Sequence, residues 1–360
     1  MKKSSAAPAS ASTITIGLDL GDRQSNFHIL ALDGETLRQG RVATTREDLA
    51  KFFGELAPAR IVMEVGGHSP WVSRLAQSSG LETIVANPRK VALITQNERK
   101  NDRADAERLA RLGRVDPKLL SPIQHRGESS QADLSVHHAR SLLVKTRTAL
   151  INFVRGQVKS LGYRLSSCST ESFHRKVFDE IPTELELALR QVVRTIGMIT
   201  VRIDFFDAAI ERMAKERYPE TGVMRQVDSV GALIATRFAL TIEDPRRFED
   251  SRQVGAFLGL TPRQQSSGKS NPELGITKAG DRDMRRLLVI AANRILGRGK
   301  DCDLRRFGMK IAARGSKNAR KRAKVAVARK LAVLLHHLWR TGEVYDPFYM
   351  TRRRGEPVPA

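Results

Sequence analysis

The chain has 360 residues, enough for two or three domains that each bury a core, and its 41% of hydrophobic residues indicates a folded rather than a disordered protein. Lys and Arg number 62 against 39 acidic residues, and this net charge of +23 predicts a polyanionic partner, most commonly nucleic acid. Two widely separated cysteines exclude a disulfide framework or a Cys-rich zinc site, and the lack of an apolar run of about 20 residues argues against a membrane span.

The first part of the sequence alternates strand and helix patterns. Residues 1–12 carry two lysines and small residues without the apolar core of a signal peptide, so we expect a flexible tail and a cytoplasmic protein. Three strands in a meander are then predicted, followed by alternating helices and strands. The predicted strands are 13–20, 26–32, 37–44, 60–65 and 81–86, and the predicted helices are 46–56, 69–79, 88–95 and 102–112. This order predicts an α/β domain over 13–125 with a mixed sheet of the RNase H-like type.

The middle of the chain, 126–220, has a different pattern. Apolar residues recur at helical intervals over 129–161 and again over 189–213, with a break marked by Pro182 and the serine cluster 166–169. The pattern predicts a long helical hairpin or coiled coil. Packing within one chain and contact between two chains explain the apolar stripes equally well.

The third part, 221–348, is predicted to be mostly α-helical and is strongly basic. Its last helix, at about 317–340, combines an apolar face with several lysines and arginines. Residues 349–360 are expected to form a loose basic tail.

Four acidic residues in the first domain take positions that favour a metal site. Asp19 and Glu64 each end a predicted strand, and Asp102 and Asp105 lie three apart, on one face of a helix. Each acid alone has an ordinary explanation, as a turn former or as a partner of the helix dipole. Together they would converge in an RNase H-like sheet, because its first and fourth strands are neighbours. Converging carboxylates repel one another unless a cation such as Mg²⁺ neutralises them.

Four short motifs around these acids carry a family resemblance. They are 17–19 (Gly-Leu-Asp), 63–67 (Met-Glu-Val-Gly-Gly), 85–89 (Val-Ala-Asn-Pro-Arg) and 100–106 (Lys-Asn-Asp-Arg-Ala-Asp-Ala). They resemble the DEDD transposases of bacterial insertion sequences, RuvC-like enzymes also called bridge recombinases, and the resemblance covers about 14–347. It implies that Asp19, Glu64, Asp102 and Asp105 hold Mg²⁺, or Mn²⁺ in its place, as catalytic metal ligands.

The resemblance also implies what the protein does and with which partners. Members of this family excise and insert their mobile element by strand exchange, guided by a structured non-coding RNA. The expected partners are therefore DNA, this guide RNA and further copies of the chain in a dimer or tetramer. A bacterial cytoplasmic, nucleoid-associated location follows from the same resemblance.

A second block of motifs lies in the basic third part. Segments 256–269, 275–281 and 285–288 resemble the second conserved domain of the same transposases. In that family a serine at this place is the nucleophile, which implies Ser267, with Ser266 as the alternative. The nearby basic residues are expected to contact nucleic-acid phosphates: Lys269, Lys278, Arg282, Arg285 and Arg286.

One loop departs from the family pattern. Residues 227–231 resemble a helix-hairpin-helix loop, but Asp228 and Ser229 replace the usual Pro-Gly, and an aspartate would repel phosphate. An ordinary capped turn explains this loop equally well.

Two other functions fit the same residues. The first is a RuvC-like structure-specific endonuclease that uses metal-activated water, which would still cleave DNA after Ser267→Ala. The second is a binding protein without catalysis, which would keep all its activity after Asp19→Ala.

Overall fold

The computed structural model describes residues 14–87, 102–263, 274–316 and 318–357, and for 102 and 103 it describes the backbone alone. The chain divides into two compact units, 1–128 and 129–360. We call them the N-terminal and the C-terminal unit and describe each by itself. None of the helices in the described ranges is both long and apolar enough to cross a bilayer.

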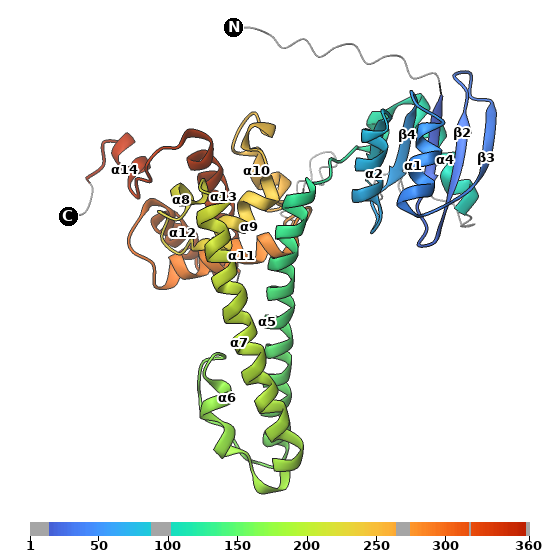
Figure 1. Cartoon of the computed structure of the whole chain (residues 1–360). Coiled ribbons are helices and arrows are strands. Elements are labelled where there is room, and N and C mark those ends of the chain that lie inside the picture. Colours follow the sequence, from blue (N-terminus) through green and yellow to red (C-terminus); the bar gives the residue numbers. More distant parts are fainter. Residues whose placement is uncertain (1–13, 88–101, 264–273, 317, 358–360) are drawn as a thin grey trace. The chain divides into compact units, whose positions relative to one another are not determined.

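The N-terminal unit is built on a five-stranded mixed sheet (Figure 1). The strands are β1 (Thr15–Asp19), β2 (Gln24–Leu30), β3 (Thr36–Ala43), β4 (Arg60–Glu64) and β5 (Glu82–Ala86), in the order β3-β2-β1-β4-β5. The first three form an antiparallel meander, whereas β4 runs parallel to β1 and β5 parallel to β4. The predicted α/β domain with a mixed sheet is thereby confirmed.

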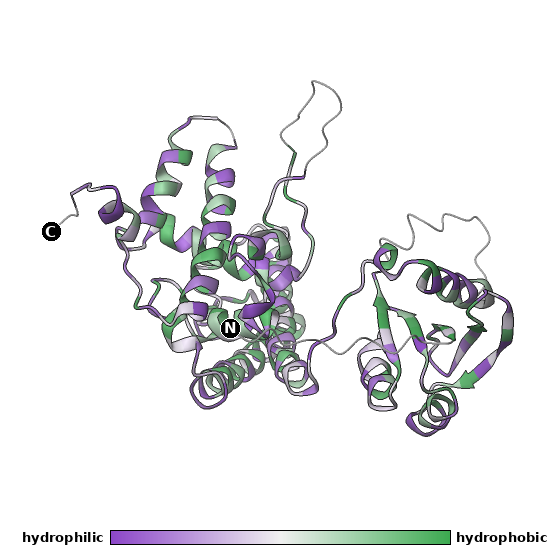
Figure 2. Ribbon diagram, turned by 90° about the horizontal axis from the view of Figure 1, so that it is seen from above, coloured by the Kyte–Doolittle hydropathy of each residue, from purple (hydrophilic) through white to green (hydrophobic). Residues whose placement is uncertain are grey.

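Helices cover both faces of this sheet because alternate residues of each strand point to opposite sides. On one face, α1 (Arg46–Gly54) and α2 (Ser69–Ser78) pack on a core that includes Ile61 and Met63 of β4. On the other face, α4 (Asp102–Val115) and the 3₁₀ turn at Pro117–Leu120 pack against Val62, which lies between those two residues. Figure 2 shows hydrophobic residues on several of the strands between these helices.

The C-terminal unit begins with the predicted helical hairpin. The two long helices α5 (Glu128–Ser160) and α7 (Glu186–Glu216) run antiparallel, and α6 (Phe173–Lys176) with 3₁₀ turns at Phe178–Glu180 and Thr183–Leu185 lies near its tip (Figure 1). An ion pair between Arg140 and Asp207, with N–O distances of 2.5 and 2.9 Å, joins the helices. The apolar cluster at the tip includes Val154 of α5 and Val193 of α7. This confirms the prediction of two long helices with a break between them.

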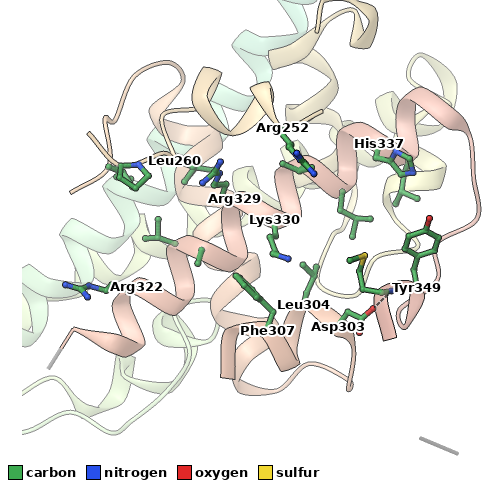
Figure 3. A pocket seen from close by; sticks show the side chains of 18 of the residues that line it. Arg252, Leu260, Asp303, Leu304, Phe307, Arg322, Arg329, Lys330, His337 and Tyr349 are labelled. Carbon is green, nitrogen blue, oxygen red and sulfur yellow. Dashed lines mark hydrogen bonds between the residues drawn. The ribbon is translucent and has the colours of Figure 1, made fainter. Parts of the chain in front are cut away.

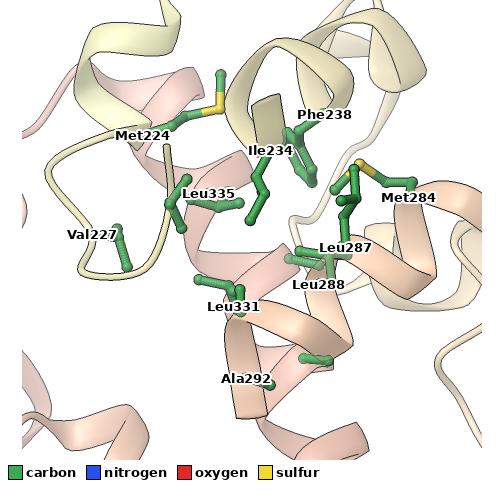
Figure 4. Packing of buried hydrophobic residues seen from close by; sticks show 14 of the residues in the cluster. Met224, Val227, Ile234, Phe238, Met284, Leu287, Leu288, Ala292, Leu331 and Leu335 are labelled. Atoms are coloured by element: carbon green, nitrogen blue, oxygen red, sulfur yellow. The ribbon is translucent and has the colours of Figure 1, made fainter. Parts of the chain in front are cut away.

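The rest of the C-terminal unit is a helical body around one apolar core (Figure 4). Its helices are α8 (Thr221–Met224), α9 (Ala232–Ile242), α10 (Gln253–Phe257), α11 (Arg282–Gly297), α12 (Asp303–Ala312), α13 (Ala319–Thr341) and α14 (Tyr349–Arg353), with a 3₁₀ turn at Pro245–Arg247. Phe238 of α9, Leu288 of α11 and Leu331 of α13 are fully buried there. The final basic helix begins and ends within two residues of its predicted bounds.

The prediction of a loose tail after Pro347 is wrong for α14. The Asp303 carboxylate accepts hydrogen bonds from the backbone N–H of Met350 at 2.7 Å and from that of Thr351 at 3.2 Å. It also accepts one from the Thr351 hydroxyl at 2.5 Å, and Thr351 is buried. One carboxylate therefore satisfies the donors at the start of this helix, an interaction that composition cannot reveal.

Candidate active site

The sheet brings Asp19 and Glu64 next to each other. β1 and β4 are parallel neighbours in which Gly17 pairs with Val62 and Leu18 with Met63. Asp19 and Glu64 are the next residues of the two strands, and both are half-buried. Residues at equivalent positions of parallel strands point to the same face, so the two carboxylates share one face at the carboxyl end of the strands.

Helix α4 packs on that same face and fixes where the other two acids lie. A Cβ atom on Gly17 would overlap the carbonyl oxygen of Ala106 and would come within 2.6 Å of the amide nitrogen of Ala110. Only glycine permits the backbones of the helix and the strand to approach this closely. Gly17 lies two residues before Asp19 and therefore on the same face of β1.

The helix runs antiparallel to the two strands. Near its C-terminus, the carbonyl of Gly113 accepts a hydrogen bond from Arg60 at 3.0 Å, and Arg60 is the first residue of β4. Arg114 donates to the carbonyl of Leu32 at 3.1 Å, just beyond the end of β2 that pairs with the start of β1. The N-terminus of α4 therefore points to the edge of the sheet at which Asp19 and Glu64 lie.

Simple geometry brings Asp102 to the same edge. Asp19 lies two residues beyond Gly17, or about 6.6 Å along the strand. Asp102, the first residue of α4, lies four residues before Ala106, or about 6 Å along the helix. The backbone thus supports the predicted convergence, while the side chain of Asp102 lies outside the described part of the chain.

Asp105 forms an ion pair with an arginine of its own helix. Its carboxylate accepts a hydrogen bond at 2.8 Å from Arg108, and both side chains are about 30% exposed. Among the side chains that the structure describes, no group of three His, Cys, Asp or Glu is arranged to hold a metal ion. The four acids would nevertheless supply only carboxylate oxygens, the donors that Mg²⁺ and Mn²⁺ prefer.

The segment with the predicted nucleophile connects the two arms of a short antiparallel ladder in the C-terminal unit. Arg263 N–H donates to the carbonyl of Gly275 at 3.0 Å and Thr277 N–H to that of Thr261 at 2.9 Å. Ser266, Ser267 and Lys269 lie between these arms and outside the described residues, so their roles stay predictions.

The predicted phosphate-binding residues of α11 and the turn before it have different environments. Lys278 and Arg282 are exposed, as a phosphate contact requires. Arg285 instead donates through one guanidinium nitrogen to the carbonyls of Leu258, Ala279 and Gly280, and so ties the ladder to α11.

Arg286 is likewise engaged within the protein. It donates to the hydroxyl of Ser141 at 3.0 Å and lies 3.6 Å from the carboxylate of Asp283. Neither arginine is as available to a phosphate as Lys278 or Arg282.

The loop 227–231, which departs from the family pattern, is joined to the turn after α11 by its own aspartate. The carboxylate of Asp228 accepts a hydrogen bond at 3.3 Å from the backbone N–H of Lys300, in the turn after α11. Ser229 has a φ of 71° and a buried hydroxyl that has no partner among the described atoms. These contacts give Asp228 a structural role.

A buried ion pair next to the ladder was missed in the sequence. Arg237 of α9 and Asp281 lie 2.8 Å apart, with side chains that are 3% and 14% exposed. Asp281 also caps α11 by accepting a hydrogen bond from Met284 N–H at 2.8 Å. The signal for this pair was a single charged residue, Arg237, in the largely apolar sequence of α9.

His137 of α5 lies beside this ion pair. It is 3% exposed, and neither of its ring nitrogens has a hydrogen-bond partner among the described atoms. Burial, together with the positive charges of Arg237 and Arg140, lowers the pKa of His137 to about 3. The ring is therefore neutral at pH 7.

Comparisons with known proteins match both halves of the chain. A family model of DEDD transposases named for IS110 matches residues 16–162, and a model described as the transposase IS116/IS110/IS902 family matches residues 222–308. The transposase for insertion sequence element IS1111A of Coxiella burnetii is 29% identical over 92% of this chain and 90% of its own length. The transposase for insertion sequence element IS1328 of Yersinia enterocolitica is 27% identical over 77% of this chain and 82% of its own length. The four acids lie within the first matched range and Ser267 within the second.

Proposed function

The chain belongs to the IS110-type DEDD transposases and is a DNA transposase, and from this premise we propose that it excises and inserts an insertion sequence by RNA-guided strand cleavage and exchange. The observation that carries the proposal is the direction of α4. Its N-terminus, with Asp102 and Asp105, reaches the sheet edge at which Asp19 and Glu64 end their strands. The strand order, with a three-stranded meander followed by parallel β4 and β5, supports an RNase H-like N-terminal domain.

The four acids would hold one or two divalent cations, Mg²⁺ or Mn²⁺. The fit rests on a donor set of carboxylates alone, at the strand ends where α/β folds place their sites. When bound, such ions neutralise the charge that develops on a phosphodiester during cleavage. Protonation or amidation of any one acid would remove a negative oxygen donor and weaken this binding.

The nucleophile of the proposed reaction is the hydroxyl of Ser267. Its Oγ attacks a phosphorus of the DNA backbone, so that an Oγ–P bond forms while one bridging P–O bond breaks. The hydroxyl proton leaves the serine, and the departing DNA oxygen takes up a proton to become a free hydroxyl end. Because the phosphoserine keeps the ester bond energy, the hydroxyl end of another strand can reverse the step and join the strands in a new order.

Exposed basic residues near the ladder would orient the DNA for this step. Lys278 and Arg282 follow the segment that carries Ser267 and are exposed, so both could contact DNA phosphates near the cleaved bond. Arg285 contributes indirectly, because its bonds to three carbonyls hold the ladder against α11.

The helical hairpin supports assembly with a second copy of the chain. One stripe of α7 packs inside the unit, but a second stripe remains open to solvent, with Met198 and Val201 63% exposed and Phe205 57% exposed. Their spacing of three and four residues is that of a coiled-coil seam. Recombination needs several strands cut in one complex, and this stripe is the surface that we propose for joining protomers.

Trapping the covalent intermediate tests the proposal. The full chain is incubated with its guide RNA, Mg²⁺ and end-labelled DNA, and denaturing gels report any protein–DNA adduct. We expect an adduct with the wild type and with Ser266→Ala, none with Ser267→Ala, and none with Asp19→Asn. DNA and RNA binding should persist in both inactive variants.

Other outcomes of this experiment would contradict the mechanism. An adduct that persists in both Ser267→Ala and Ser266→Ala would exclude a serine nucleophile at this place. Cleavage without an adduct in Ser267→Ala would indicate hydrolysis by water, as in a structure-specific endonuclease. Full activity of Asp19→Asn would remove the acidic edge from the mechanism.

A further inference from the structure

A large groove runs along α13 within the C-terminal unit (Figure 3). Its volume is about 1060 Å³, just above the roughly 300–1,000 Å³ that ligand sites span. α12 and residues 343–350 form one side, and the ladder residues 260–262 and 274–278 form the other. We call it the α13 groove.

The floor of the α13 groove is apolar. Phe307 and Leu304 of α12 face α13 in Figure 3, and Leu260 contributes from the ladder. Val325 and Leu334 of α13 also line the groove and remain partly exposed. Apolar side chains that line a groove on the protein surface are typical of a binding site.

The rim of the groove is positively charged. Arg252, Lys321, Arg329 and Lys330 line it and are exposed, and the Lys330 ammonium lies 4.2 Å from the centre of the Phe307 ring. The rim cation Lys330 thus lies next to the aromatic floor residue Phe307.

The acidic residues of the groove are engaged by the protein itself. Asp303 caps α14, Asp346 pairs with Arg352, and Glu343 lies 3.1 Å from His337. No ion pair joins these acids to Arg252, Lys321, Arg329 or Lys330 in the described part of the chain, so the rim cations are available to the phosphates of a ligand.

We propose that the α13 groove binds a single strand of nucleic acid, with its phosphates on the basic rim and its unpaired bases against the apolar floor. This inference rests on the proposed function and names the form of nucleic acid that this surface takes. Unpaired bases offer flat apolar faces, which aromatic and apolar side chains can stack upon. A duplex hides these faces in its own stack, so it could use the rim but not the floor.

The position of the groove next to the ladder gives the bound strand a role. Pro262 and Ile276, which pair across the ladder, both line the groove, as does Lys278. The chain leaves the ladder after Arg263 and returns at 274, and the intervening sequence contains Ser267. A strand in the groove would therefore be held beside the ladder from which the segment proposed to attack DNA departs and to which it returns.

Binding of labelled oligonucleotides to the full chain tests the proposal without any catalytic step. The probes are a fluorescein-labelled oligothymidylate of about 20 nucleotides, longer than the roughly 4–16 nucleotides of a single-strand site, and an abasic strand of equal length. A hairpin duplex is the third probe, and fluorescence anisotropy is read over a range of salt concentrations. The abasic strand has the same phosphates but no bases, so it separates rim contacts from floor contacts.

Two groove variants and one matched control complete the design. Arg252→Gln with Arg329→Gln removes two rim charges, and Arg294→Gln with Arg298→Gln removes two exposed charges of the same unit outside the groove. Ala326→Trp fills the floor. Circular dichroism confirms that each variant is folded.

The expected results follow from the two surfaces. The wild type should bind oligothymidylate about tenfold more tightly than the abasic strand. The rim double variant should bind oligothymidylate about tenfold more weakly, and its slope of log affinity against log salt should be less steep by about 1.4, while the control double variant retains more affinity. Ala326→Trp should weaken oligothymidylate binding and leave abasic binding unchanged.

Equal affinities of the wild type for oligothymidylate and the abasic strand would overturn the proposal, as would equal losses in the rim and control variants. A groove variant that loses self-association while it keeps nucleic-acid affinity would assign the groove to a protein partner and also overturn it. Failure of the wild type to bind any of the three probes would instead count against the proposed function. Normal adduct formation combined with wild-type affinity of the groove variants would refute the groove alone.

Discussion

Breaking the buried Arg237–Asp281 pair should cost the C-terminal unit a large part of its stability. The Arg237 guanidinium lies in a helix that is almost entirely apolar and buried, and Asp281 is its acidic partner, at 2.8 and 3.1 Å. The same carboxylate caps α11 through Met284 N–H. Asp281→Asn keeps the capping oxygen but removes the charge, whereas Asp281→Ala removes both.

The magnitude follows from burial. Removing one partner of a buried ion pair leaves the other charge uncompensated and costs about 3–5 kcal/mol, so Asp281→Asn should lower the free energy of unfolding by about 3 kcal/mol. Asp281→Ala should cost about 1 kcal/mol more, because Asn caps a helix as well as Asp and Ala does not. Arg237→Met combined with Asp281→Asn should recover most of the loss, because no charge then remains buried.

Urea unfolding followed by tryptophan fluorescence measures these differences. The chain has two tryptophans, Trp71 in the N-terminal unit and Trp339 in the C-terminal unit, so a Trp71→Phe background reports the C-terminal unit alone. Arg246→Met is the matched control, because its ion pair with Asp244 is exposed and its loss should leave the midpoint unchanged. Equal midpoints for Asp281→Asn and the Arg246→Met control, or a double variant as unstable as Asp281→Asn, would refute the reasoning.

Three further predictions test other parts of the structure. The folded-state pKa of His137, about 3, lies below the ordinary value of 6.5, so the unfolded state binds the extra proton between these values. The free energy of unfolding should therefore fall by up to about 1.4 kcal/mol for each pH unit from 6.5 toward 3. Urea unfolding at several pH values should show that His137→Leu lacks this part of the pH dependence. A variant whose free energy of unfolding varies with pH as steeply as that of the wild type would contradict the prediction. Gly17→Ala should push α4 away from β1 at a cost of about 1–3 kcal/mol and reduce adduct formation, whereas Gly54→Ala, whose Cβ meets nothing within 4 Å, should do neither. Phe205→Lys should shift light-scattering masses toward the monomer, and a shift of the same size in the exposed control Glu216→Lys would argue against the α7 stripe.

Much of the fold could be predicted because the patterns that specify it are local. The five strands follow from short apolar or β-branched runs between turns, and the long α5 and α7 follow from apolar residues at helical spacing. α14 was missed because its start depends on Asp303, 46 residues before Tyr349, whose carboxylate caps it. A contact between distant residues leaves no periodic trace in the sequence.

In the candidate site, too, the features that depend on local sequence were predicted and the contacts between distant residues were not. Asp19 and Glu64 were recognised as strand-end acids, and the strand register then placed them next to each other. The close approach of α4 was not predicted, although a glycine inside a buried strand is a signal for such contacts and Gly17 could have been interpreted in this way. Arg285 was predicted to contact a nucleic-acid phosphate. The prediction rested on charge, which does not distinguish a solvent-facing arginine from one that binds carbonyls of its own chain.

The two parts of the proposed active site, the acidic edge and the serine segment, are held by different contacts. The acidic edge needs a fixed spacing between carboxylates, and the contact of Gly17 with the backbone of α4 provides it within one unit. The serine segment needs ends that are firmly held in the C-terminal unit. Its returning end is tied to α11 by Arg285, and the cap and ion pair of Asp281 hold the start of that helix. The acids belong to one unit and the serine to the other, so the proposed chemistry requires both units to reach the same phosphate.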